Sequence, residues 1–172
     1  LYLNIWTPAA SDNDRLPVMF FIHGGGFKSG YSHEITFDGD ALAQQGVLLV
    51  TIEYRLGSLG YLAHQSLRGE NGSCGNYGLL DQIAALKWVR RNIAAFGGDP
   101  ERITVFGQSA GAMSVENLVT SPLCQGDISG AIMQSAGGYT GQRICGVSMR
   151  TQAEGEALGA EFLTFLGSDT ID

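Results

Sequence analysis

The stretch Ile103-Thr-Val-Phe-Gly-Gln-Ser-Ala-Gly111 joins a short apolar run to a G-x-S-x-G pattern. Its first four residues have the character of a buried strand, and a helix-compatible segment follows the pattern directly. A sharp turn from strand to helix lifts the Ser109 hydroxyl above the sheet edge and strains its backbone. The same turn crowds Gly107 against Gly111, where glycine relieves the contact. The stretch therefore predicts a nucleophile elbow, with a glycine-rich turn and an incidental serine as the alternative.

Outside this turn, apolar runs alternate with helical patterns, which is typical of an α/β protein. The runs cover residues 1–6, 18–22, 47–54, 103–106 and 128–134. Continuous apolar runs such as Val-Met-Phe-Phe-Ile fit strands that are buried on both faces. Since helical patterns lie between the runs, right-handed crossovers should connect the strands. We expect a mainly parallel central sheet flanked by helices.

Three helices are predicted. The first spans residues 76–96, and the last begins at the capping box Thr151-Gln-Ala-Glu154 and ends at Gly167. Another begins at Ser109 and ends before Pro122. In the first helix, the apolar side chains form one stripe that should pack on the sheet: Leu79, Ile83, Leu86, Val89 and Ile93, widened by Leu80, Ala84 and Trp88. In the last helix, the capping box leads into the apolar residues Ala157, Leu158, Phe162 and Phe165.

A second motif, His23-Gly-Gly-Gly-Phe27, follows the apolar run at residues 18–22. Successive glycines let the backbone approach a ligand closely, and their N–H groups can converge on an anion. A phosphate-binding loop is the competing interpretation, but the sequence around it lacks both G-x-x-x-x-G-K-[ST] and G-x-G-x-x-G. H-G-G-G is the form of the oxyanion loop in lipases and esterases. The elbow supplies a further donor, because the helix N-terminus places the Ala110 N–H where an oxyanion would develop.

Composition excludes several classes of protein. The 172 residues are 44% hydrophobic and 16% charged, too apolar for a disordered chain, yet no apolar run approaches the ~18 residues of a membrane helix. A net charge of −7 argues against nucleic-acid and anionic-membrane partners. Cys74, Cys124 and Cys145 show no metal-ligand spacing and are interpreted as free thiols. We therefore expect no metal and no cofactor.

Together with these motifs, several segments resemble the type B carboxylesterases, the cholinesterase-like branch of the α/β-hydrolase fold. The similar segments are residues 1–8, 22–27, 54–57, 75–82, 92–100 and 106–111. This resemblance implies hydrolysis of a small-molecule ester by a Ser–Glu(or Asp)–His triad, through a covalent acyl-enzyme and without a cofactor.

Position by position, the resemblance assigns Ser109 as the nucleophile. It also implies that the backbone N–H groups of Gly25, Gly26 and Ala110 form the oxyanion hole. Two residues depart from the family pattern: Gln108 stands where glutamate is more frequent, and Glu53 where asparagine is more frequent. Neither departure removes a reacting group.

No histidine follows Ser109, although the triad order of this fold places the histidine last. His23 fits a support for the glycine loop better than a catalytic base, and His33 and His64 fit loop histidines. We therefore expect residues 1–172 to form the N-terminal part of a single catalytic domain, with the triad acid and histidine beyond residue 172. Because a serine hydroxyl without a base is a weak nucleophile, the chain alone should show little or no esterase turnover.

Two other classes remain open from the sequence. Adhesion relatives share this fold without catalysis, but they typically lose the nucleophile, whereas Ser109 and both flanking glycines are intact. An acyltransferase or lactonase would use the same residues and differ only in its products. The lack of a disulfide pattern predicts a cytoplasmic protein, although a signal peptide ahead of Leu1 would be invisible. The oligomeric state stays open.

Overall fold

The structure is a computed structural model that describes residues 1–70, 72–136, 150–168 and 171. The strands of the described residues are β1 (Leu3–Trp6), β2 (Leu16–Ile22), β3 (Leu48–Ile52), β4 (Gly98–Gln108) and β5 (Gly130–Gln134). They form one sheet in the order β1-β3-β2-β4-β5, in which β1 is antiparallel to β3 and the other pairs are parallel. The predicted strands and the mainly parallel sheet are confirmed.

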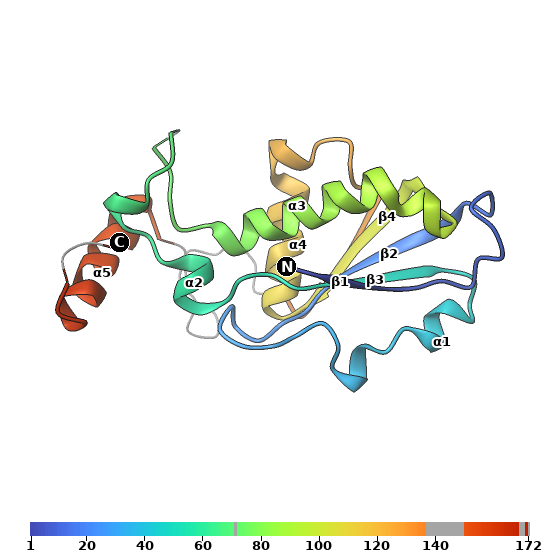
Figure 1. Ribbon diagram of the computed structural model, residues 1–172, viewed down its shortest axis with the longest axis horizontal. Coiled ribbons are helices and arrows are strands. Elements are labelled where there is room, and N and C mark those ends of the chain that lie inside the picture. The colour runs from blue at the N-terminus through green and yellow to red at the C-terminus, as the bar shows by residue number, and fades with distance from the viewer. Residues whose placement is uncertain (71, 137–149, 169–170, 172) are drawn as a thin grey trace.

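Helices cover both faces of this sheet, with α1 and α3 on opposite sides (Figure 1). The α-helices of the described residues are α1 (Asp40–Ala43), α2 (Gly57–Tyr61), α3 (Tyr77–Asn92), α4 (Ala110–Thr120) and α5 (Gln152–Phe165), and the 3₁₀ turns are η1 (Ile35–Phe37), η2 (Gln65–Leu67), η3 (Ile93–Phe96) and η4 (Pro122–Cys124). A buried hydrogen bond of 3.0 Å from Gln82 Nε2 to Ser114 Oγ links α3 to α4. None of the helices that the described residues form is long and apolar enough to cross a bilayer.

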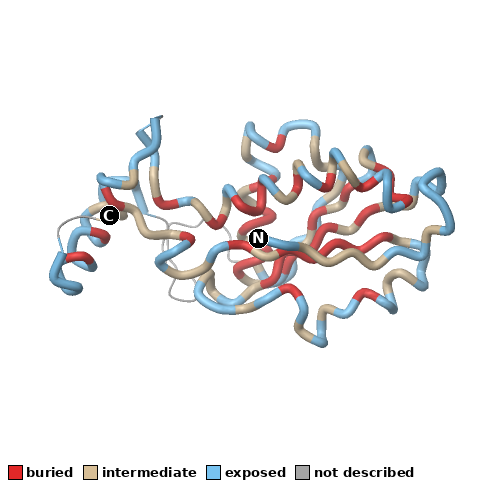
Figure 2. Tube along the Cα trace, in the orientation of Figure 1, coloured by how far each residue is buried: buried red, intermediate tan, exposed pale blue. Residues whose placement is uncertain are grey.

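The strand β3 is buried along its whole length, as Figure 2 shows for the centre of the sheet. Leu48, Val50 and Ile52 join the core that also contains residues of α3 and α4. Leu49 points to the other face, where a Cβ at Gly39, the residue before α1, would lie 2.9 Å from its side chain. Burial on both faces, predicted from the unbroken apolar run, is therefore confirmed for β3.

The predicted stripe of α3 is correct, but its predicted widening is wrong. The buried members of the stripe are Ile83, Leu86, Val89 and Ile93. Leu80, Ala84 and Trp88 are exposed instead. The side chains of Asp81 and Gln82 take buried positions, because each has hydrogen-bonding partners there. The α-helix ends at Asn92 and a 3₁₀ turn completes the predicted range.

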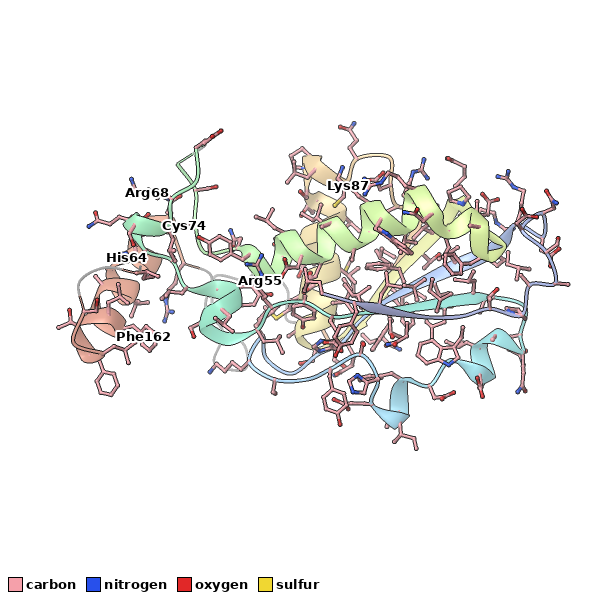
Figure 3. The ribbon with its side chains drawn as sticks, viewed as in Figure 1. Arg55, His64, Arg68, Cys74, Lys87 and Phe162 are labelled. Carbon is pink, nitrogen blue, oxygen red and sulfur yellow. The ribbon has the colours of Figure 1, made fainter. Side chains whose placement is uncertain are left out.

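The capping box that opens α5 is confirmed, and most of the apolar side chains that follow it are exposed. Thr151 N–H donates to Glu154 Oε2 over 2.8 Å, and Glu154 N–H donates to Thr151 Oγ1 over 3.3 Å. The apolar residues named from the sequence, Ala157, Leu158, Phe162 and Phe165, are exposed (Figure 3 labels Phe162). Gly159 and Leu163 are buried instead, because a glycine lets the α5 backbone approach Ala63, whose carbonyl oxygen lies 1.9 Å from where a Cβ would stand.

Candidate active site

Ser109 lies between the last residue of β4 and the first residue of α4. Its φ of 56° and ψ of −123° fall in a region that L-residues rarely adopt, at a typical cost of about 1–3 kcal/mol. The backbone is held from two sides: Ser109 N–H donates to Gln134 O over 2.9 Å, and Ser109 O accepts from Met113 N over 3.0 Å. The predicted strain at this turn is therefore present and is stabilised by β5 and α4.

The two glycines of the pattern are required by close backbone contacts. A Cβ at Gly107 would lie 2.5 Å from the carbonyl carbon of Gly111, so the predicted crowding is confirmed. A Cβ at Gly111 would lie 2.0 Å from Ile22 O, at the end of β2. The first turn of α4 therefore rests directly on the end of the neighbouring strand, which fixes where Ser109 stands.

The glycine loop after β2 turns sharply. Gly25 has φ of 104° and Gly26 has φ of 62°, which glycine adopts without a steric penalty. Gly25 O accepts from the N–H groups of Lys28 and Ser29, each over 3.1 Å. Since the Gly25 carbonyl takes part in this turn, the peptide planes of the loop have a defined orientation.

This loop meets the elbow. A Cβ at Gly24 would lie 3.3 Å from Ser109 Cβ and 2.8 Å from Gln108 O, so the two backbones are in contact. Ala110, the first residue of α4, is 2% exposed, and the side chain of the N-cap residue Ser109 does not cap this helix N-terminus. Free N–H groups of a helix N-terminus attract developing negative charge. The structure thus brings the beginning of the glycine loop, Ser109 and Ala110 to one place.

His23 is bound to the glycine loop. Its ring is 1% exposed and stacks on Tyr54, with ring centroids 4.5 Å apart. His23 Nδ1 lies 2.8 Å from Gly24 O, and the Tyr54 hydroxyl donates to His23 O over 2.8 Å. Burial raises the pKa of Tyr54, so its hydroxyl keeps the proton that it donates. This environment matches a support for the loop.

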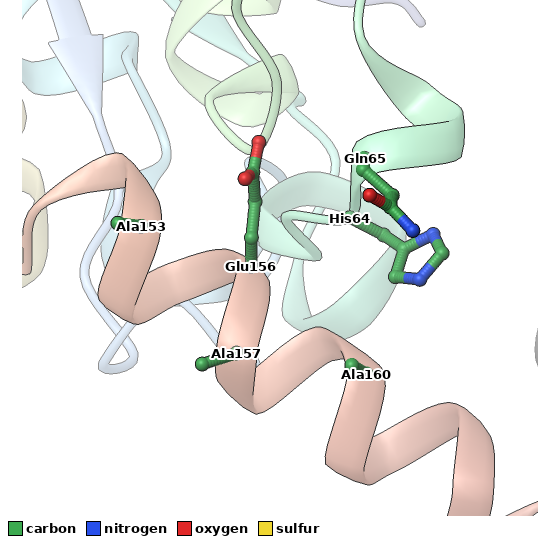
Figure 4. A pocket seen from close by; sticks show the side chains of 6 residues that line it. All are labelled: His64, Gln65, Ala153, Glu156, Ala157 and Ala160. Atoms are coloured by element: carbon green, nitrogen blue, oxygen red, sulfur yellow. The ribbon is translucent and has the colours of Figure 1, made fainter.

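The other two histidines lie elsewhere in the loops. His33 is exposed and its Nδ1 lies 3.6 Å from Glu53 Oε1. His64 is buried, and its Nδ1 accepts from Ser66 N over 3.2 Å as the N-cap of η2. His64 also lines a cavity of about 300 Å³ between η2 and α5 (Figure 4), whose lining includes none of the four predicted site residues.

Two contacts of acidic side chains were not predicted from the sequence. Glu53 Oε1 accepts from Ser32 N over 2.7 Å and from Ser32 Oγ over 2.8 Å. Asp81 accepts from Arg55 Nε over 2.7 Å, next to the segment that leads into α2. These partners are more than 20 residues apart in the chain, and no periodicity signals them. The sign available in the sequence was Glu53, which stands where asparagine is more frequent in the family.

Residues suited to metal binding do not gather in the part of the chain that the structure describes. No group of three or more histidine, cysteine, aspartate or glutamate side chains there can hold a metal ion. Cys74 and Cys124 are free, as predicted. Cys145 lies outside the described residues.

The sequence of this chain is similar to a known protein family. The sequence profile of the Carboxylesterase family matches residues 1–158. Fumonisin B1 esterase of Sphingopyxis macrogoltabida is 50% identical over 98% of this chain and 30% of its own length. Para-nitrobenzyl esterase of Bacillus subtilis is 46% identical over 97% of this chain and 32% of its own length.

A solved structure indicates the same family as the sequence comparisons. A Geobacillus stearothermophilus carboxylesterase superposes with a TM-score of 0.86 at 43% identity, over 97% of this chain and 34% of the solved one. The chain spans about a third of the length of these relatives. On the family profile, the sequence identity and the superposition together, the chain belongs to the carboxylesterase family, on the α/β-hydrolase fold.

Proposed function

We propose that this chain carries the nucleophile and the oxyanion hole of a serine carboxylic-ester hydrolase. The observation that supports this most is the strained Ser109, with φ of 56°, held at the N-terminus of α4 against the glycine loop. A backbone held in such a region at a strand-to-helix turn is typical of a nucleophile elbow. The substrate class is a small, uncharged carboxylic ester.

The reaction begins when Ser109 Oγ attacks the ester carbonyl carbon. A carbon–oxygen bond forms, and the carbonyl electron pair moves onto the oxygen. The backbone N–H groups of Gly25, Gly26 and Ala110 donate hydrogen bonds to this oxyanion, which stabilises the transition state more than the neutral ester. The electron pair on the oxyanion then re-forms the carbonyl, the bond from carbon to the alcohol oxygen breaks, and the alcohol leaves with the proton that came from Ser109. Water then hydrolyses the acyl-enzyme to the carboxylic acid and free Ser109.

Proton transfer in both steps requires a general base that becomes a general acid. All three histidines precede Ser109, and His23 is buried against Tyr54 with Nδ1 next to Gly24 O. We therefore assign the histidine and its acid partner to residues beyond 172, in accordance with relatives about three times as long. A chain of residues 1–172 alone should then hydrolyse esters no faster than the buffer.

The names of the relatives favour hydrolysis over adhesion or acyl transfer. They are an esterase of fumonisin B1, a para-nitrobenzyl esterase and, among mammalian relatives, cocaine esterases and an acylcarnitine hydrolase. These names share a carboxylic ester as the bond that is cleaved. The alcohol and acyl groups differ widely, so the part of the fold shared with this chain supports a reaction rather than one substrate.

Hydrolysis of para-nitrophenyl acetate by the full-length gene product tests the proposal. Ser109→Ala should lower kcat/KM by about 10⁴-fold or more, because the covalent route is removed. Ser114→Ala, a serine-to-alanine change in the same helix, should keep the activity within about threefold, because Ser114 bonds to Gln82 and not to substrate. Turnover that persists in Ser109→Ala would contradict the proposal.

A further inference from the structure

The glycine loop, residues 24–31, has a buried residue at each end. His23 precedes it and Ser32 follows it, and each is 1% exposed. One carboxylate faces both of them: Glu53, the first residue after β3, whose side chain is 14% exposed. Glu53 takes no part in the proposed chemistry. Its position, however, lets a single side chain connect the two ends of the loop.

At the exit of the loop, Glu53 accepts two hydrogen bonds on one oxygen. Ser32 N–H donates to Oε1 over 2.7 Å and the Ser32 hydroxyl donates to the same atom over 2.8 Å. Asn4 Nδ2 donates to Ser32 Oγ over 3.0 Å, so the serine oxygen already accepts a bond and its hydrogen is directed to Glu53. Hydrogen bonds to an ionised acceptor are stronger than neutral ones, so this end of the loop is firmly held.

At the entrance of the loop, Glu53 lies next to His23 without a hydrogen bond between them. His23 Nδ1 lies 2.8 Å from Gly24 O, and a carbonyl only accepts, so Nδ1 carries the hydrogen. In the neutral ring Nε2 is then an acceptor. Among the described residues, Nε2 of this buried ring has no hydrogen-bond partner, and Glu53 Oε2 lies 3.9 Å from it. Glu53 Oε2 therefore lies beside the His23 ring but beyond hydrogen-bond distance.

Two further ionisable side chains lie beside Glu53 and His23. His33 Nδ1 lies 3.6 Å from Oε1, from a side chain that is 59% exposed. Tyr54 stacks on His23 and keeps its proton, because burial raises its pKa. The contacts of Glu53 with the loop are therefore made through Ser32 and His23, with His33 at the solvent side.

We propose that Glu53 is a positioning residue for the oxyanion hole, and that it aligns the N–H groups of Gly25 and Gly26 by holding Ser32 at the exit of their loop through two hydrogen bonds and by packing beside His23 at the entrance. This inference rests on the proposed function, because it concerns the same transition state. Glu53 acts through the loop and does not touch the substrate. Loss of its contacts should weaken stabilisation of the oxyanion more than binding of the neutral ester.

The test compares Glu53→Ala with Glu53→Gln in the full-length gene product. Glutamine keeps an oxygen at the Oε1 position for both Ser32 donors and places an N–H group at the Oε2 position, toward His23 Nε2. We expect Glu53→Ala to lower kcat for para-nitrophenyl acetate about 10-fold to 100-fold with KM changed less than about threefold. Glu53→Gln should restore kcat to within about threefold of the original. Binding of a trifluoromethyl ketone, which forms an oxyanion at Ser109, should weaken in parallel with kcat.

Asp99→Asn provides the matched control. Asp99 is a carboxylate of comparable burial: its side chain is 9% exposed, against 14% for Glu53, and it pairs with Arg15 over 2.8 Å. It lies in β4 near Gly98, at the opposite end of the strand from Gln108. This variant should lower the melting temperature while kcat stays unchanged. If Glu53→Ala does not fold, Ser32→Ala removes one of the two bonds to Oε1 and should lower kcat by a smaller factor.

The outcomes separate this inference from the proposed function. Unchanged kcat in Glu53→Ala or Ser32→Ala, or a Glu53→Gln variant as slow as Glu53→Ala, would overturn the positioning role while hydrolysis still depended on Ser109. Hydrolysis that is independent of Ser109 would instead overturn the proposed function itself.

Discussion

Gly111→Ala should destabilise the protein because the new methyl group has no room. A Cβ at Gly111 would lie 2.0 Å from Ile22 O, 2.9 Å from Ile22 C and 2.9 Å from His23 O. The shortest of these is about 1.5 Å below an ordinary contact distance. All three neighbours are backbone atoms at the end of β2, so no side-chain rotation can relieve the clash. Either α4 or the end of β2 must move.

The magnitude follows from two opposing effects. Overpacking of a well-packed site costs about 1–3 kcal/mol, and a backbone contact this short belongs at the upper limit. Alanine in place of glycine inside a helix stabilises the folded state by about 1 kcal/mol. The free energy of unfolding should therefore fall by about 2 kcal/mol. For a chain of this length that corresponds to a melting temperature lower by roughly 4–8 °C.

Thermal unfolding followed by far-ultraviolet circular dichroism measures this change. Gly155→Ala is the control, because Gly155 also lies within a helix, α5, and its Cβ would lie 3.2 Å from Ala63 Cβ, with no backbone atom in conflict. That control should shift the free energy of unfolding by no more than about 1 kcal/mol in either direction. A Gly111→Ala protein as stable as the original would refute the argument that α4 rests on the end of β2.

Three further results are expected. Gly25→Ala should lower kcat for para-nitrophenyl acetate about 10²-fold or more, because the new Cβ would lie 2.0 Å from Ser29 O and the φ of 104° does not suit alanine. Steady-state kinetics of the full-length product measure this, and an unchanged kcat would contradict it. The Arg68 guanidinium, which hydrogen-bonds to Glu156, lowers the pKa of Glu156 from 4.5 to about 2. A depressed carboxyl pKa stabilises the folded state above pH 4.5 and loses that effect as pH falls toward 2, so hydrogen exchange of α5, corrected for intrinsic rates, should lose protection over that range. Glu156→Gln should lose less protection than the original, and the loss that remains belongs to Glu154, whose pKa is also lowered by its hydrogen bonds with Thr151. Residues 1–172 expressed alone should not hydrolyse the ester above the buffer rate, and turnover that Ser109→Ala abolishes would contradict this.

The sheet and the elbow could be predicted from the sequence because their signals are local. An unbroken apolar run predicts β3, and five residues of G-x-S-x-G specify a turn whose strain is visible at Ser109. The antiparallel pairing of β1 with β3 was not predicted. Pairing direction depends on which strands meet in space, which a run of apolar residues does not encode.

Hydrophobicity does not identify the buried residues of α3 and α5 correctly where tertiary contacts decide which side chains face the protein. In α3, Gln82 is fully buried because Ser114 of another helix accepts its amide hydrogen, while Trp88 is 36% exposed. In α5, Gly159 and not Phe162 faces the protein, because close backbone packing against Ala63 selects the smallest residue. Apolar periodicity identifies the helix but not the face that its neighbours accept.

The candidate site was predictable as far as its motifs extend. Two short patterns predict Ser109, Gly25, Gly26 and Ala110, and the structure brings Gly24, in one pattern, against Ser109 in the other. The carboxylate of Glu53 belongs to neither pattern, and its link to Ser32 spans 21 residues. Such supports follow from the meeting of strand ends at one edge of the sheet, so they become visible only in the folded structure.

Covalent labelling of Ser109 tests the central claim most directly. The folded full-length gene product, treated with a fluorophosphonate probe and analysed by peptide mass spectrometry, should carry one adduct on the peptide that contains Ser109. The adduct should disappear after denaturation in urea and in Ser109→Ala, because reactivity requires the folded elbow and oxyanion hole. No adduct in the folded protein, or an adduct on a different serine, would contradict the account.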